Sequence, residues 1–183
     1  MQKNESIEMP PDDSCPEYAY CVFCETGKEE YVASRIGHDP RITVLVPTIE
    51  HDEHRNGTWE KCTRKMLPGY LFLYSAESEN CEELKRIDGV IKALKYDDKD
   101  YKLTGSDRQF AEWLYRNNGR IGMSSAIKEG TKIRIVGGPL LSYAGSILEV
   151  KRSKRIAKVA VTLGDVTREI WMGFEWLTST DIA

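Results

Sequence analysis

Short apolar runs separated by polar turns dominate residues 18–118 and predict alternating strands and helices. Residues 19–24 form such a run, with tyrosine and valine, and predict a buried strand. A helix is expected to follow and to end at Gly37, because Thr26 and Glu29 have the spacing of a capping box and apolar side chains then recur at helical intervals. The first two predicted elements are therefore a strand and a helix.

The next segment predicts a long polar β-hairpin. Residues 42–49 are β-branched and contain Pro47, which is typical of an edge strand or a strand end. Asn56 and Gly57 are a strong turn signal, so residues 58–64 are expected to return as the partner strand.

Four further elements are expected before residue 119. They are a strand at residues 69–74, a short helix opened by Asn80 and ending near Gly89, a strand at 90–94, and a helix from Ser106 to Asn118. The resulting order, β-α-β-β-β-α-β-α, predicts a ferredoxin-like α+β domain over residues 18–118 with an inserted hairpin.

The pattern changes after this domain. Residues 119–126 contain two glycines and two serines without periodicity and predict a linker, and residues 127–178 predict a small all-β barrel. The expected barrel strands are 131–136, 144–150, 156–163 and 166–171. Residues 1–17 are acidic, contain three prolines, and predict a disordered leader.

The charge of the chain is divided unevenly between its two parts. The whole sequence has a net charge of -3, but residues 1–126 contain 17 Lys and Arg against 23 Asp and Glu, a net charge of -6. Residues 127–177 contain 9 against 5, a net charge of +4. Because phosphate binding responds to local positive potential, the barrel is the candidate for contacting nucleic acid.

Several classes of protein are disfavoured by composition. No run approaches the roughly 18 apolar residues that a membrane helix needs, and the N-terminus lacks the pattern of a signal peptide. The five cysteines are an odd number that does not suit a disulfide framework. These features predict a cytoplasmic protein with reduced thiols and no membrane partner.

Metal and catalytic patterns are also disfavoured. Cys21 and Cys24 have the spacing of a zinc knuckle, but on a strand they point to opposite faces. His51 and His54 do not form the HExxH pattern, and His38 is the only other histidine. The sequence shows no phosphate-binding loop and no Ser-His-Asp arrangement, so we expect neither an enzyme nor a metal or other cofactor.

The barrel segment carries a recognisable motif. Residues 129–140 and 143–150 resemble the KOW motif, in which Gly130 opens a strand, a Gly-Gly-Pro turn follows, and Gly145 allows a tight bend. The family usually has an aromatic residue after the Gly-Pro pair, whereas this chain has Leu140. A generic SH3-like barrel would explain the same glycines.

A second motif lies in the N-terminal domain. Residues 65–73 read Lys-Met-Leu-Pro-Gly-Tyr-Leu-Phe-Leu, and together with residues 46–48 and 87–90 they resemble the N-terminal domain of NusG transcription elongation factors. The two motifs occur in the family's order and the resemblance covers residues 18–177. It implies a monomer whose aromatic-lined depression docks on a coiled coil of RNA polymerase. The candidate docking residues are Tyr20, Phe23, Met66, Leu67 and Tyr70.

The resemblance also implies a role without chemistry. The N-terminal domain would bind the polymerase clamp and favour the pause-resistant state. The tip of the predicted hairpin, with His51, His54 and Arg55, would reach the opposite wall of the polymerase cleft.

Basic residues gather between the second and third predicted barrel strands, where five cations lie within eight residues. Arginine and lysine bind phosphates, and exposed aromatic rings stack on unpaired bases. The candidate RNA-binding residues are Arg134, Tyr143, Lys151, Arg152, Lys154, Arg155, Lys158 and Arg168.

An acidic first domain joined to a basic KOW domain resembles the LoaP antiterminators, which implies that the RNA target is a hairpin in a nascent transcript. Two alternatives stay open: a housekeeping NusG whose barrel binds a ribosomal protein or Rho, and a ribosome-associated KOW protein. Refolding of the barrel into helices, as in RfaH, is disfavoured by the β-branched residues of 131–136 and 156–166.

Overall fold

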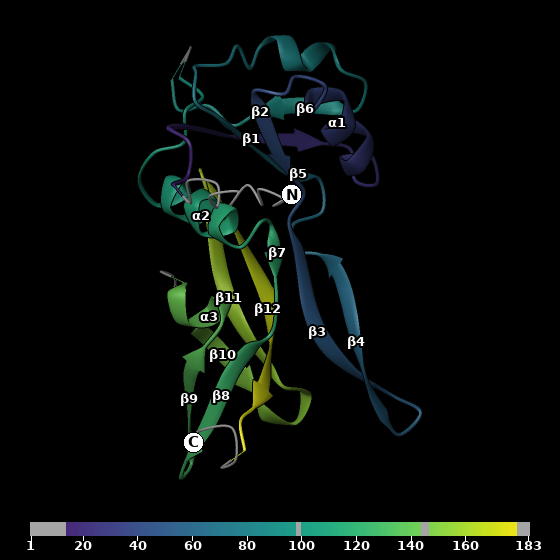
Figure 1. Ribbon diagram of the computed structural model, residues 1–183, viewed down its shortest axis with the longest axis vertical. Helices are drawn as coiled ribbons and strands as arrows, with labels where there is room; N and C mark the ends of the chain where they lie inside the picture. Colours follow the sequence, from purple (N-terminus) through teal and green to yellow (C-terminus); the bar gives the residue numbers. More distant parts are fainter. Residues whose placement is uncertain (1–13, 98–99, 144–146, 179–183) are drawn as a thin grey trace, which may run out of the picture.

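The computed structural model describes residues 14–97, 100–143 and 147–178, so most of the predicted leader lies outside the described residues. The molecule is elongated, with an N-terminal sheet at one end and a barrel at the other (Figure 1). The N-terminal sheet has the strand order β2-β5-β1-β6, and each neighbouring pair is antiparallel. This is the order of a ferredoxin-like sheet, as predicted. The strands are β1 (Tyr18–Cys24), β2 (Ile42–Leu45), β5 (Tyr70–Ser75) and β6 (Val90–Ala93).

The two faces of this sheet are covered by different elements. Leu71 and Leu73 of β5 pack in one buried cluster with helix α1 (Glu29–Ile36), whereas Phe72 and Tyr74 pack in another with helix α2 (Gly105–Arg116). The alternation follows from the period of two along a strand. Cys21 and Cys24 also fall in different clusters, as predicted.

Two predicted helices differ in the structure, one in its N-terminal cap and one in its type. Lys28 is the N-cap of α1 and makes no side-chain cap, so the predicted capping box of Thr26 and Glu29 is wrong. The Glu29 carboxylate instead accepts backbone hydrogen bonds from Gly27 and Gly69, at 2.8 Å each. The short helix expected after Asn80 is only a 3₁₀ turn, η1 (Glu83–Arg86).

A second sheet contains the predicted hairpin. The expected strand at 42–49 is broken after Leu45, because Pro47 has no N–H to donate, and the hairpin consists of β3 (Thr48–Arg55) and β4 (Thr58–Lys65). Asn56 and Gly57 both have positive φ angles, 48° and 86°, as a two-residue hairpin turn requires.

The predicted linker is not an irregular segment. Within residues 119–126, strand β7 (Arg120–Ile121) pairs in parallel with β3, and strand β8 (Ser124–Glu129) begins. Hydrogen bonding to β3 orders this glycine-containing segment, which composition alone could not indicate.

The C-terminal sheet has the order β10-β11-β12-β8-β9. Strands β9 and β11 lie within one residue of their predicted ends, β10 ends one residue later than predicted, and β12 is five residues longer at its C-terminus. The predicted start of β10 and Gly145 lie outside the described residues. The remaining elements are β9 (Lys132–Gly137), α3 (Pro139–Ser142), β10 (Ile147–Lys151), η2 (Arg152–Lys154), β11 (Ile156–Leu163) and β12 (Val166–Trp176).

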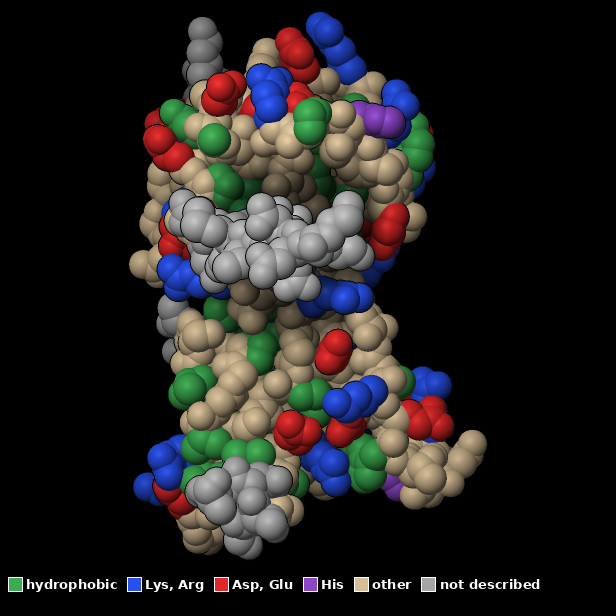
Figure 2. Space-filling view, in the orientation of Figure 1, with side chains coloured by type: hydrophobic (Ala, Val, Ile, Leu, Met, Phe, Trp, Pro, Cys, Tyr) green, Lys and Arg blue, Asp and Glu red, His purple; other side chains and the backbone are tan. Residues whose placement is uncertain are grey.

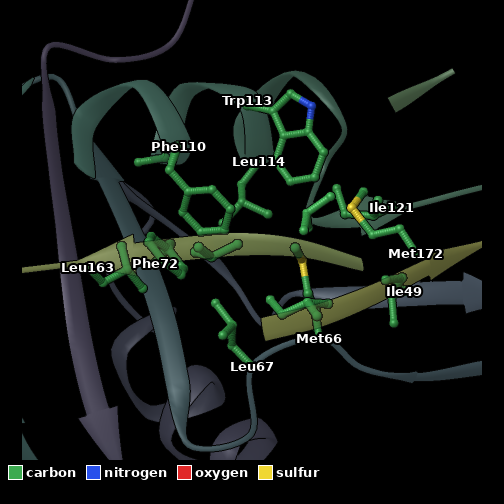
Figure 3. Close-up of a cluster of buried hydrophobic side chains, with 14 of the residues drawn as sticks. Ile49, Met66, Leu67, Phe72, Phe110, Trp113, Leu114, Ile121, Leu163 and Met172 are labelled. Atoms are coloured by element: carbon green, nitrogen blue, oxygen red, sulfur yellow. The ribbon is translucent and has the colours of Figure 1, made fainter. Parts of the chain in front are cut away.

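The two domains share one core. Side chains of α2, of β3 and β5, and of barrel strands β11 and β12 belong to a single buried cluster, part of which Figure 3 shows. Trp113 of α2 donates its indole N–H to the carbonyl of Pro139 at 3.1 Å, and the backbone N–H of Gly164 donates to Asp107 at 3.0 Å. The barrel is therefore docked on the N-terminal domain. No helix in the described part of the chain is long and apolar enough to cross a membrane.

Candidate nucleic-acid interface

Two exposed cations of the barrel, Arg152 and Lys154, lie on the turn η2, which joins β10 to β11. Arg155 ends this turn in the left-handed conformation, with φ of 53°, and its N–H donates to the carbonyl of Arg152. The geometry presents Arg152 and Lys154 to solvent. Within the described ranges no carboxylate lies within 4.0 Å of either side chain. These two cations are available to phosphates.

Two further lysines lie against a tryptophan on the outer face of the barrel. The ammonium groups of Lys151 and Lys158 are 4.4 and 5.0 Å from the ring centroid of Trp171. Lys158 also contacts Glu169 at 3.0 Å and Glu149 at 3.2 Å, and both carboxylates raise its pKa. Its charge is therefore partly neutralised within the barrel, unlike the charges on η2.

The other predicted RNA-binding residues do not converge on this surface. Arg134 pairs with Glu129 at 2.6 Å, and Arg168 lies beside the N-terminal domain at a small cavity that Met66 also lines. Tyr143 packs on an aromatic ring of α2 and donates its hydroxyl to the carbonyl of Ala160. On the face in Figure 2, acidic and basic side chains are interspersed over the barrel.

Arg155 points to the β3–β4 hairpin instead of to solvent. Its guanidinium is 3.6 Å from a carboxylate oxygen of Asp52 and 4.4 Å from the ring centroid of Trp59. In addition, Arg64 of β4 donates to the carbonyl of Trp171 at 3.2 Å. These contacts hold the hairpin alongside the barrel.

The predicted hairpin residues are distributed along β3. His51 is buried near the barrel and its Nε2 is 2.8 Å from Glu53, whereas its Nδ1 has no hydrogen-bond partner in the part of the chain that the structure describes. His54 packs edge-on against Trp59. Arg55 is exposed and hydrogen-bonds Glu53. Only the end of the hairpin is therefore free of the barrel.

Four of the five predicted docking residues lie together in the structure, but the barrel covers most of the surface that they form. Phe23 and Tyr70 meet edge to face at 4.7 Å between centroids, and Met66 and Leu67 lie in the same core cluster. All but Phe23 of these four are buried, and barrel residues line the adjoining cavity. Tyr20 differs, because it belongs to the cluster on the opposite sheet face, where its hydroxyl accepts the N–H of Glu79.

Sequence reasoning missed the two tryptophans that face a cleft between hairpin and barrel. Trp59 and Trp171 line this cleft, whose volume is about 720 Å³. One signal was present: Trp59 is a large aromatic residue within the polar strand at residues 58–64. The partner wall could not be found from sequence, because β4 and β12 meet only in the tertiary structure. Among the described residues, no group of three or more His, Cys, Asp or Glu could hold a metal ion.

Known proteins resemble this chain over most of its length. A family profile described as "Transcription termination factor nusG" matches residues 19–110. The transcription termination/antitermination protein NusG of Pseudomonas aeruginosa is 29% identical over 159 residues, which cover 79% of this chain and 88% of that protein. The NusG protein of Thermus thermophilus is 26% identical over 162 residues, with the same two coverages.

A solved structure also matches the fold. The structure described as "Domain interaction in Thermotoga maritima NusG" has a TM-score of 0.52 and 18% identity, and the match covers 85% of this chain and 93% of that one.

Proposed function

Since the chain belongs to the NusG family of transcription termination and antitermination proteins, we propose that it is a processive antitermination factor of the LoaP kind. Its N-terminal domain binds RNA polymerase, and its barrel binds an RNA hairpin in the nascent transcript. The observation that carries the RNA-binding role is the exposed η2 turn, where Arg152 and Lys154 have no carboxylate partner among the described residues. The net charge of +4 over residues 127–177 supports it.

Polymerase binding requires a change in domain arrangement. The candidate docking surface includes Met66, Leu67 and Tyr70, which are buried where the N-terminal domain meets the barrel. A polymerase coiled coil can reach these side chains only when the barrel has moved away. The factor then acts without chemistry, because its binding free energy shifts an existing equilibrium between paused and active polymerase.

The salt dependence of RNA binding tests the barrel. Full-length protein with Arg152→Ala and Lys154→Ala is expected to bind RNA hairpins more weakly, and the slope of log affinity against log salt should fall in magnitude by about 2, because two phosphate contacts are lost. The slope is measured by fluorescence anisotropy at several salt concentrations.

The matched control removes one lysine and one arginine from the other 3₁₀ turn. Lys85→Ala with Arg86→Ala on η1 makes the same charge change in the N-terminal domain and should leave the slope unchanged. If the wild-type protein does not bind RNA hairpins, or if both double variants change the slope equally, the barrel is not the RNA-binding surface.

One observation favours the housekeeping alternative, in which the barrel binds a ribosomal protein or Rho. Among the residues that the structure describes, strand β10 pairs only with β11, and it is exposed throughout, with Leu148 51% exposed. Such an edge can accept a strand from a protein partner. A Leu148→Glu variant that loses binding to ribosomal protein or Rho in a pull-down, while RNA binding persists, would support this alternative.

A further inference from the structure

We propose that the cleft between the β3–β4 hairpin and the barrel is a binding site for an unpaired nucleobase of single-stranded nucleic acid. The site is distinct in kind from the RNA-hairpin recognition proposed above, because it takes a single base between two walls. One wall contains Trp59 and Arg64, and the other contains Lys154 and Trp171. Its volume of about 720 Å³ falls in the usual range of ligand clefts.

Trp59 gives the cleft its affinity for a base, because Lys151 and Lys158 already lie against the ring of Trp171. Trp59 is a large aromatic side chain on a strand of mostly exposed, polar residues, and it is itself 39% exposed. Its size is therefore not explained by packing in a hydrophobic core. His54 supports the ring from its edge, at 5.2 Å between centroids, and Arg155 lies over it. A supported but exposed indole is the typical stacking platform of proteins that bind single strands.

The charges of the cleft complement a phosphate backbone. Its two lining acids are engaged by arginines: Asp52 pairs with Arg155 at 3.6 Å, and Glu53 with Arg55. Arg64 and Lys154 also line the cleft, and neither has a carboxylate within 4.0 Å in the described part of the chain. The remaining positive charge therefore lies beside the aromatic rings, where a nucleotide places its phosphate.

A strand bound in this cleft contacts both domains at once. The cleft exists only while the barrel is docked, because β4 supplies one wall and β12 the other. A ligand that binds only the docked arrangement stabilises that arrangement. Binding in the cleft should therefore compete with any partner that needs the barrel to move away.

The test uses full-length protein and single-stranded oligonucleotides of about eight nucleotides, because such lengths match typical binding sites and stacking tolerates different bases. Binding is followed by quenching of tryptophan fluorescence and by anisotropy. Wild-type protein should bind, Trp59→Ala should bind about tenfold more weakly, and Trp59→Phe should retain most of the affinity because a ring remains.

Two controls separate stacking from other effects. Tyr31→Ala removes an aromatic residue that is 48% exposed on α1 and should leave binding unchanged. Asp52→Asn weakens the ion pair with Arg155 without removing Trp59, so it should lower the affinity less than Trp59→Ala does. An equal loss of affinity, in a protein whose X-ray scattering curve shows the barrel still docked, would contradict stacking on Trp59 and overturn the proposal. Absence of single-strand binding, or equal affinities for wild type and Trp59→Ala, would also overturn it.

Single-stranded RNA and DNA of the same sequence show which nucleic acid the cleft binds. An RNA hairpin as a third ligand separates the proposed cleft from the RNA-hairpin binding proposed for the barrel. Preference for RNA indicates recognition of the 2′-hydroxyl, whereas equal affinity indicates a site for either strand, and both results support the cleft. Hairpin binding that survives Trp59→Ala but is lost on removal of Arg152 and Lys154 isolates the function of η2. Single-strand binding without hairpin binding refutes the proposed RNA-hairpin role and leaves the cleft in place.

Discussion

A Glu29→Gln substitution is expected to lower the free energy of unfolding at neutral pH by about 3 kcal/mol. Glu29 is fully buried, and its carboxylate accepts hydrogen bonds from the backbone of Gly27 and Gly69 and from the Lys65 ammonium at 2.6 Å. Glutamine has the same shape but places a donating amide against groups that are themselves donors. Urea denaturation followed by circular dichroism measures the loss.

The same substitution should remove part of the pH dependence of stability. Burial raises the pKa of Glu29, but the Lys65 ammonium and backbone N–H groups outweigh it and lower the pKa from 4.5 to about 2. A carboxyl group with a lowered pKa stabilises the fold above its unfolded pKa, and this contribution disappears as pH falls from about 4.5 to about 2. The difference between wild type and Glu29→Gln should therefore be largest at neutral pH and shrink towards pH 2.

Glu30 offers a matched control for this prediction. Its carboxylate contacts the same Lys65 ammonium, at 2.8 Å, but it is exposed to solvent. Glu30→Gln is therefore expected to cost less than about 1 kcal/mol. Equal losses for the two variants, or a Glu29→Gln effect that does not change with pH, would contradict the assigned role of the buried carboxylate.

A Gly173→Val substitution is expected to weaken docking of the barrel by about 3 kcal/mol. A Cβ atom at position 173 would lie 3.0 Å from both the carbonyl oxygen of Glu50 and the Cα of His51, and would collide with the Met123 sulfur. The sulfur can rotate away, but the backbone of β3 cannot move without breaking its sheet. Small-angle X-ray scattering should show a longer particle, and the two domains should unfold in separate thermal transitions.

Gly122→Ala is the control for loss of a glycine in this region. Its added Cβ would meet only the Glu50 carboxylate, at 3.7 Å, which is an ordinary contact. This variant should therefore keep the wild-type scattering curve and melting temperature. A Gly173→Val protein that also kept the wild-type scattering curve and melting temperature would show that β12 and β3 can separate locally without undocking the barrel.

Undocking has a consequence for the proposed function. Apparent affinity for a partner scales with the fraction of protein in the competent state. If polymerase binds the covered surface that includes Met66 and Tyr70, Gly173→Val should bind polymerase more tightly than wild type in a pull-down titration, and it should lose the cleft that Trp59 and Trp171 line.

The elements of the N-terminal domain could be predicted largely from sequence because their signals are local. The apolar run of β1, the Asn56-Gly57 turn and the alternation along β5 each depend on neighbours a few residues away. The errors arose where distant contacts changed a local preference. Glu29 has the spacing of a helix cap, but the buried N–H of Gly69, 40 residues away, is the group it satisfies.

The candidate site was predicted less well, because charge along a sequence does not show which charges are paired in space. Five basic residues lie close together from Lys151, the last residue of β10, to Lys158 in β11, but their side chains point in different directions. Arg152 and Lys154 face solvent, whereas Arg155 reaches across to Asp52 on another domain. Lys158 is paired with two glutamates by the strand register.

Sequence by itself determined the family resemblance, most of the strands and helices of the N-terminal domain and the basic character of the barrel, since motif spacing and composition are properties of short segments. Tertiary structure decided that residues 120–121 form a strand, that Gly173 lies against the backbone of β3, and that Trp59 and Trp171 face the same cleft. Each of these depends on contacts between residues far apart in the chain, where close packing and hydrogen-bond satisfaction select one arrangement from many that the local pattern allows.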